Sequence, residues 1–197
     1  MTKALLIAAS LGAALIPSAA QAQALPAAVV AVVDLDKVTG TCNACRTATT
    51  ALRGQVTALQ NREKALAAPL QTEQKSIQAA IDALNGKEPD AALQARVKAF
   101  QTKQQQGAAE LQRQQQQIQL NQQYVNKQIA DKIGPIYSQV MQKRGANLMV
   151  EIGTTLASGA TLDVTNDVLT ALNAALPSIS TTAPAQPAQQ QAQPQGR

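Results

Sequence analysis

The stretch "NGKEPD", residues 85–90, separates two long segments in which apolar residues recur at helical spacing. Gly86 is the residue type that most often ends a helix, because glycine adopts left-handed backbone angles without steric cost. Pro89 favours the first turn of the next helix, where an N–H group would have no partner in any case. The stretch therefore predicts a turn between two antiparallel helices, with the tip of a helical hairpin at residues 85–90.

The segments on both sides of this turn carry the apolar repeat of a coiled coil. Apolar residues follow one another mostly at spacings of three, four or seven, as in the seam of a heptad repeat. Three positions on the second seam are polar: Gln104, Gln114 and Asn121. The pattern predicts two helices of about 40 residues or more, forming an arm ~60 Å long over residues 42–144. The first seam consists of Leu52, Val56, Leu59, Leu66, Leu70, Ile77, Ile81 and Leu84, and the second of Leu93, Val97, Phe100, Leu111, Ile118, Val125, Ile129, Ile133, Ile136 and Val140.

Four residues that weaken helices lie at matching heights on the two predicted helices. Pro69 and Gly107 are at nearly equal distances from the turn, so they should face each other halfway along the arm. Gly134 and Pro135 lie at the base of the arm, opposite residues 40–41. Proline removes a helix hydrogen bond and glycine lowers helix propensity. These residues therefore predict two hinges, unless the helices tolerate them without a functional role.

Short apolar segments flank the arm and predict a small sheet. The segment "AAVVAVVDL", residues 27–35, is β-branched and ends before a turn at residues 39–41, which predicts a buried strand over Ala28–Leu35. The segment "NLMVEI", residues 147–152, predicts a second strand, and "TTLASG", residues 154–159, predicts a short third one.

The segment "LDVTNDVLTALNAAL", residues 162–176, predicts an amphipathic helix capped by Asp163 or Thr165. The predicted fold class is α+β, with a long antiparallel helical hairpin inserted into a small β-sheet body formed by residues 27–41 and 145–176. A sheet this small has open edges and little core, so oligomerisation is expected.

The two ends of the chain have compositions that a folded domain does not use. Residues 1–22 combine Lys3, an apolar run too short to cross a bilayer and a final small-residue motif "AQA", which together predict a cleaved secretory signal peptide. The mature chain is then expected in a bacterial periplasm, which is oxidising. Residues 177–197 are rich in Pro and Gln and predict a disordered tail.

The formal net charge of +5 is unevenly distributed along the chain. Between Arg46 and Arg144 there are fourteen Lys and Arg residues but only seven Asp and Glu residues, so the arm is basic. A basic surface attracts acidic partners at long range, although a single lysine usually marks only a solvated helix face. The candidate residues for partner binding by this field are Lys64, Lys75, Lys87, Arg96, Lys98, Lys103, Arg113 and Lys127.

The segment "GTCNACRTAT", residues 40–49, places Cys42 and Cys45 in a C-x-x-C pattern. The pattern is typical of thioredoxin-like enzymes, but that fold needs several more strands alternating with helices. The chain has no histidine, which argues against haem attachment and leaves a zinc site short of ligands. Four interpretations remain open, with the first favoured: a local or inter-subunit structural disulfide, a redox pair activated by Arg46 and the helix start, a metal site shared between subunits, or two free thiols.

The order of these elements resembles the Skp family of periplasmic chaperones, also called OmpH-like. The segment "VVAVVDLDKV", residues 29–38, is similar to the family's opening strand. The segment "ANLMVEIGTTLASGATLDVTNDVLTALN", residues 146–173, is similar to its closing strands and final helix, including a D-x-T-x-x-V-L core. The resemblance extends over residues 27–176. The C-x-x-C pair and the glutamine runs in the second helix depart from the family pattern.

The resemblance implies a homotrimer in which strands of three subunits form a β-barrel body and three arms surround a cavity. It implies an ATP-independent holdase, without cofactor or metal, that binds unfolded outer membrane proteins in this cavity. The residues agree with a protein that is not an enzyme, because the sequence shows neither a phosphate-binding motif nor a convincing nucleophile–base pair.

Two other functions remain open at this point. One is a structural coiled-coil scaffold of the cell envelope, which would bind a fixed folded partner. The other is a thiol–disulfide protein that uses Cys42 and Cys45. Anionic envelope lipid or lipopolysaccharide is a further partner that a basic arm would attract. Nucleic acid is not expected as a partner, because the chain is predicted to be exported and has only one Phe, two Tyr and no Trp for base stacking.

Overall fold

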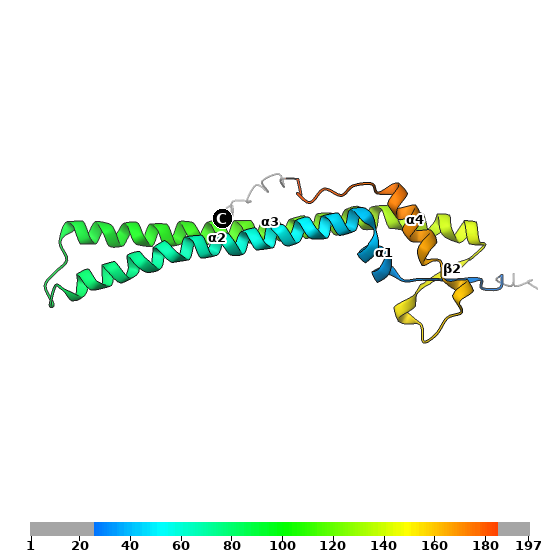
Figure 1. Ribbon diagram of the computed structural model, residues 1–197, viewed down its shortest axis with the longest axis horizontal. Helices are drawn as coiled ribbons and strands as arrows, with labels where there is room; N and C mark the ends of the chain where they lie inside the picture. The colour runs from blue at the N-terminus through cyan, green and yellow to red at the C-terminus, as the bar shows by residue number, and fades with distance from the viewer. Residues whose placement is uncertain (1–25, 185–197) are drawn as a thin grey trace, which may run out of the picture.

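The computed structural model describes residues 26–184 and shows a long arm attached to a small body (Figure 1). The predicted signal peptide, residues 1–22, lies outside the described residues. The helical hairpin and the small sheet of the predicted α+β fold are confirmed. The elements in chain order are β1 (Val30–Val33), α1 (Leu35–Thr41), α2 (Asn43–Asp82), α3 (Ala91–Arg144), β2 (Leu148–Glu151), two 3₁₀ turns η1 (Ile152–Thr154) and η2 (Ala160–Leu162), and α4 (Thr165–Ala175).

The arm consists of α2 and α3, which run antiparallel (Figure 1). Helix α2 has 40 residues and α3 has 54, which corresponds to lengths of about 60 and 80 Å. At the tip, Asn85 and Gly86 have φ angles of 49° and 85°, in the left-handed region that commonly follows a helix end. Asp90 caps α3, because its carboxylate accepts a hydrogen bond from Leu93 N at 2.8 Å. Pro89 therefore precedes α3 instead of occupying its first turn.

The seam between α2 and α3 is only partly covered along the arm. Ile77 and Phe100 are buried there, whereas the seam residues Val56 and Ile81 remain exposed. Two helices alone cannot enclose a seam from all sides, because each contributes one narrow apolar stripe. The arm thus presents a surface on which apolar side chains are accessible to another molecule.

The sheet of the body has two parallel strands, with Val32 of β1 opposite Val150 of β2. On its other side β1 is bridged by Asp163, and Val164 N donates a hydrogen bond to Val32 O at 2.8 Å. Strand β1 is therefore covered along both edges, whereas the outer edge of β2 pairs with no strand in residues 26–184. The predicted third strand at residues 154–159 is wrong, because the Glu151 side chain accepts a hydrogen bond from the backbone of η1 and the chain turns there.

Residues 35–41 form a short helix where the sequence predicted the end of a strand and a turn. The strand ends at Val33, and the Asp34 carboxylate caps α1 by accepting a hydrogen bond from Lys37 N at 2.7 Å. The prediction was wrong because the β-branched run before Asp34 extended the expected strand past a residue that is a common helix cap.

The core of the body lies where α1, α4 and the base of the arm pack against β1. Val38, Cys42, Val168 and Leu172 are fully buried at its centre. At the start of α4, the Asp163 carboxylate accepts a hydrogen bond from Thr165 N at 2.8 Å. The predicted cap by Asp163 or Thr165 is nevertheless wrong, because the helix begins at Thr165 and Val164 occupies the cap position without a side-chain hydrogen bond.

Contacts at both ends of its first turn fix α4 to the rest of the body. Hydrogen bonds from the side chain and backbone of Thr165 lower the pKa of Asp163. The Thr165 hydroxyl accepts a hydrogen bond from Asp34 N at 2.9 Å, which connects α4 to the end of β1. Arg144 and Lys143, at the end of α3, form ion pairs with Asp167.

Residues 177–184, here called the strap, follow α4 and run back along the arm (Figure 1, orange). Ile179 packs against the body core, and side chains of α2 and α3 hydrogen-bond to the backbone beyond it. The predicted disorder is therefore wrong for the strap, because polar side chains of the arm pair with its backbone groups. Residues 185–197 of the predicted tail lie outside the described residues.

Candidate functional site

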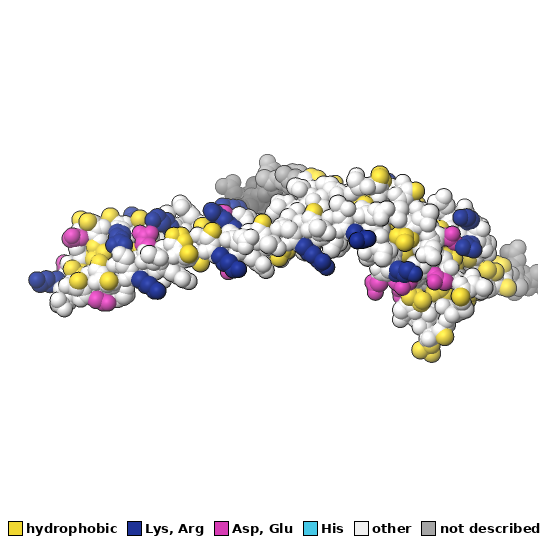
Figure 2. All heavy atoms as spheres, in the orientation of Figure 1, with side chains coloured by type: hydrophobic (Ala, Val, Ile, Leu, Met, Phe, Trp, Pro, Cys, Tyr) yellow, Lys and Arg dark blue, Asp and Glu magenta, His cyan; other side chains and the backbone are white. Residues whose placement is uncertain are grey.

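The basic side chains singled out from the sequence are spread along the arm. Figure 2 shows dark-blue side chains spaced along the arm, with uncharged surface and a few magenta acidic side chains between them. They therefore form an extended field instead of a single pocket. Lys64 and Lys75 lie on α2, Lys87 lies at the tip, and Arg96, Lys98, Lys103, Arg113 and Lys127 lie on α3.

Three of these eight basic residues are paired with carboxylates. Lys103 and Arg96 both reach Glu73 across the hairpin, at 2.9 and 3.9 Å, and Lys127 lies 2.7 Å from Asp131 on its own helix. Within residues 26–184 no ion pair is found for the other five. These five, here called the open cations, are Lys64, Lys75, Lys87, Lys98 and Arg113.

A groove of about 280 Å³ opens halfway along the arm. It is lined by Leu66, Pro69 and Leu70 of α2 and by Gly107 of α3. Gly107 is buried and leaves the seam unfilled opposite Leu66. The structure thus places Pro69 and Gly107 at the same groove, as their distances from the turn indicated.

The helices continue without interruption through all four predicted hinge residues. Pro69 lies inside α2, and Gly107, Gly134 and Pro135 lie inside α3. Gly134 is exposed, with open space where a side chain would stand. Bending of the arm at these positions stays a prediction about its motion.

Ion pairs across the hairpin flank the central groove. Arg62 donates two hydrogen bonds to the Glu110 carboxylate, at 2.7 and 2.9 Å. This hydrogen bonding lowers the pKa of the Glu110 carboxyl group and raises the pKa of the Arg62 guanidinium group. Both side chains are open to solvent, so the pair mainly fixes register. Arg62 was not predicted from the sequence, although Arg62 and Glu110 lie at nearly equal distances from the turn.

We expect Gly107→Ala to raise the free energy of unfolding by about 1 kcal/mol, because alanine favours helix over glycine. The added Cβ would lie 3.7 Å from a Leu66 methyl group, an ordinary van der Waals distance. Gly54→Ala is the matched control, because Gly54 lies in α2 with nothing near its missing Cβ. Urea titration should show at least as large a gain for Gly107→Ala as for Gly54→Ala, and a smaller gain would contradict this packing.

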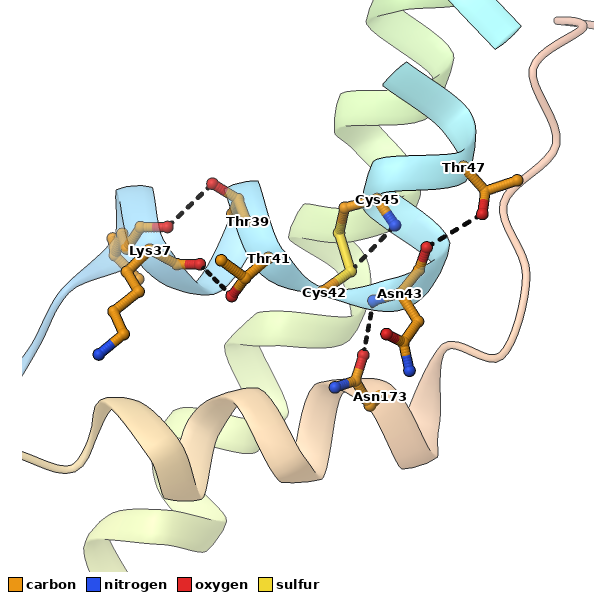
Figure 3. Close-up of a disulfide and its surroundings, with 9 residues drawn as sticks. Lys37, Thr39, Thr41, Cys42, Asn43, Cys45, Thr47 and Asn173 are labelled. Carbon is orange, nitrogen blue, oxygen red and sulfur yellow. Dashed lines mark hydrogen bonds between the residues drawn. A yellow bond between two sulfur atoms is a disulfide. The ribbon is translucent and has the colours of Figure 1, made fainter. Parts of the chain in front are cut away.

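Cys42 and Cys45 are joined by a disulfide at the junction of α1 and α2 (Figure 3). The Cys42 sulfur caps α2 by accepting a hydrogen bond from Cys45 N at 3.1 Å, and Asn43 N donates to the Asn173 side chain of α4 at 2.8 Å. Cys42 is 0% exposed and Cys45 is 2% exposed. Thiol–disulfide exchange needs a sulfur that an attacking thiolate can reach. The burial of both residues therefore favours a structural disulfide that braces the root of the arm.

We expect the folded chain to resist dithiothreitol, because both sulfur atoms are enclosed by the body core. Maleimide labelling after reductant treatment should require denaturant. Cys42→Ala/Cys45→Ala should lower the free energy of unfolding by about 2 kcal/mol, as a short closed loop implies. Rapid labelling of the folded chain would contradict this account and favour the redox interpretation.

Residues 26–184 contain no group of three or more His, Cys, Asp or Glu that could hold a metal ion. Among the helices in this range, none is both long and apolar enough to cross a membrane.

The family model for outer membrane protein (OmpH-like) matches residues 29–172. The chain belongs to the OmpH-like family. The OmpH-like chain is also similar to a crystal structure described as a candidate outer membrane chaperone (OmpH-like) from Caulobacter crescentus CB15, with a TM-score of 0.66. The two chains are 15% identical, and the alignment covers 80% of this chain and 90% of the other, so the likeness establishes the fold. No curated protein matches the OmpH-like chain significantly.

Proposed function

We propose that this chain is an ATP-independent periplasmic holdase that binds unfolded outer membrane β-barrel proteins and prevents their aggregation. Membership of the OmpH-like family supports the general role of a periplasmic chaperone for outer membrane proteins. The observation that carries the finer proposal is the arm, a thin hairpin with an accessible apolar seam and five open cations. A holdase shifts the folding equilibrium of its client by mass action, so it needs such a surface and no catalytic group.

The chemistry of the arm matches that of an unfolded barrel protein. Barrel strands alternate apolar and polar residues, so an unfolded client offers many short apolar contacts and no single epitope. Exposed seam residues such as Val56 and Ile81 would make these contacts. The open cations would attract acidic clients before contact is made. Anionic envelope lipid or lipopolysaccharide would compete for the same cations.

We infer that the working form is a homotrimer whose arms surround the client, as the family resemblance implies. The body supports self-association, because the outer edge of β2 pairs with no strand in the described residues and three leucine side chains of the body are exposed. Leu148 is 45% exposed, Leu162 is 39% exposed and Leu156 is fully exposed. An open strand edge and accessible apolar residues are surfaces on which another protein chain commonly binds.

Neutralising four open cations should slow the capture of an acidic unfolded client several-fold at low salt, because attraction at a distance sets the encounter rate. The test variant carries Lys64→Gln, Lys75→Gln, Lys98→Gln and Arg113→Gln, and capture is followed by stopped-flow fluorescence. The difference should shrink as salt screens the charges. Equal rates at low salt would remove the open cations from the proposal.

Binding of unfolded and folded client separates a holdase from an envelope scaffold. A urea-unfolded barrel protein diluted into the chain should elute with it from a size-exclusion column. The same barrel protein folded in detergent should elute alone. A scaffold predicts the opposite preference, for one folded partner, and co-elution of the folded barrel only would contradict the proposal.

A further inference from the structure

The strap is bound to the arm through its main chain. The Gln128 amide donates a hydrogen bond to Ser180 O at 2.8 Å and accepts one from Ser180 N at 3.0 Å. One side chain of α3 thus pairs with both backbone groups of a single residue, as a neighbouring β-strand does.

Two further amide side chains continue this contact towards the middle of the arm. Gln55 of α2 donates to Thr181 O at 3.0 Å, and the Asn121 oxygen accepts from Ala183 N at 2.8 Å. Asn121 is buried and also accepts a hydrogen bond from Gln117 at 2.9 Å while donating one to Gln55 at 2.9 Å. We call the side chains of Gln55, Asn121 and Gln128 the amide groove.

The strap side chains alternate in exposure along the amide groove. Ile179, Thr181 and Ala183 are half-buried against the arm, whereas Ser180 and Thr182 are exposed. This period of two is that of an extended strand, although the chain bends at Thr182, where the Ser180 hydroxyl donates a hydrogen bond to Thr182 O at 3.2 Å. The hydrogen bonds reach backbone atoms and the inward side chains are small or apolar, so the groove recognises the main chain more than a particular sequence.

We propose that the amide groove is a binding site for the main chain of an extended polypeptide, and that the strap occupies it as a built-in competitor of client segments. The second part rests on the proposed holdase function. An unfolded barrel strand offers an extended backbone with alternating apolar side chains, which is the chemistry that the strap presents. Contact through the backbone suits a chaperone that must accept many sequences.

Hydrogen bonds within the amide groove also explain how the groove stays ordered when a client segment replaces the strap. When the strap leaves, Asn121 keeps its hydrogen bonds to Gln55 and Gln117, so the groove remains ordered for the next chain. A tethered strap competes at an effective concentration in the ~mM range. A client segment therefore displaces it only when the client also contacts other parts of the arms, which restricts the groove to long unfolded chains.

The test uses the full chain with Ser180→Pro/Ala183→Pro, which removes both strap N–H groups that donate to the amide groove. The matched control is Ser178→Pro/Thr182→Pro, which places the same two prolines at exposed strap positions. The probe is a fluorescein-labelled alternating Val-Thr octapeptide, followed by fluorescence anisotropy. We expect the strap-release variant to bind the probe at least ~10-fold more tightly than the natural chain and the control.

Two further measurements test whether the probe binds the Gln128 side chain through its backbone. Methylation of the probe's backbone nitrogens should abolish binding, and so should Gln128→Met added to the strap-release variant, whereas Gln123→Met at an exposed position of α3 should have no effect. Equal probe affinity of the natural chain and the strap-release variant, or unchanged binding of the methylated probe, would overturn the inference.

Comparing probe binding with suppression of aggregation distinguishes a failure of the amide-groove inference from a failure of the proposed holdase function. If the probe fails to bind the strap-release variant while the chain still keeps a barrel protein soluble, the amide groove is wrong and the holdase stands. If the probe binds as expected but the barrel protein aggregates, the peptide site stands and its use for clients is overturned.

Discussion

Leu156→Asp is expected to convert an assembled protein into monomers. Leu156 is fully exposed on the loop between η1 and η2, and Leu148 of β2 and Leu162 of η2 are also exposed on the body. Burying one leucine side chain contributes about 1.5–3 kcal/mol, and a trimer repeats this burial in every subunit. An aspartate at this position would instead carry a charge into the interface, and removing an unpaired charge from water is strongly unfavourable.

Sedimentation velocity gives the oligomeric state directly. The natural chain should sediment as a trimer, Leu156→Asp as a monomer, and Val56→Asp as a trimer, because Val56 lies on the arm away from the body. Unchanged circular dichroism of Leu156→Asp would show that the subunit remains folded. A monomeric natural chain, or a Leu156→Asp variant that still assembles, would contradict the proposed interface.

Leu172→Ala is expected to lower the free energy of unfolding of the body by about 2–5 kcal/mol, the usual effect of a large-to-small change in a core. Leu172 is fully buried where α4 packs beside Val38, Cys42 and Val168. Because small domains have only about 5–15 kcal/mol of stability, this loss is large. The substitution should also weaken the binding of the strap to the arm, because the strap continues directly from α4.

Tyrosine fluorescence in a Tyr124→Phe background is the appropriate signal for this measurement, because Tyr137 packs against the body core whereas Tyr124 lies farther out on α3. Ile81→Ala, at an exposed seam position near the tip, is the control and should cost about 1 kcal/mol or less. A loss for Leu172→Ala no larger than that for Ile81→Ala would show that the body core is not where the structure places it.

The hairpin was predictable because its signals are local and periodic. The spacing of the apolar residues shows which residues share one face of each helix, and Gly86 indicates the turn from the local sequence alone. Helix α1 was missed because one capping residue, Asp34, follows a long β-branched run. The third strand was expected from composition, but the chain turns at Glu151 through hydrogen bonds that composition does not record.

The candidate site likewise has features that the local sequence reveals and contacts between distant residues that it does not reveal. Basic residues are visible in the sequence, but the pairing of Lys103 with Glu73 depends on the register between two helices. The strap illustrates the strongest case, because Gln55 and Thr181 are hydrogen-bonded although 126 residues separate them. A segment with the composition of a disordered tail is ordered here by partners that local patterns do not reveal.

The central claim is that the chain prevents aggregation of unfolded barrel proteins without ATP and without thiol chemistry. The most direct test is light scattering after a urea-unfolded outer membrane barrel protein is diluted into buffer, with the natural chain, with Cys42→Ala/Cys45→Ala, or with neither. We predict that both forms suppress scattering, with saturation near one trimer per client. Scattering that rises equally in all three samples would contradict the account, and suppression by the natural chain alone would assign the activity to the disulfide.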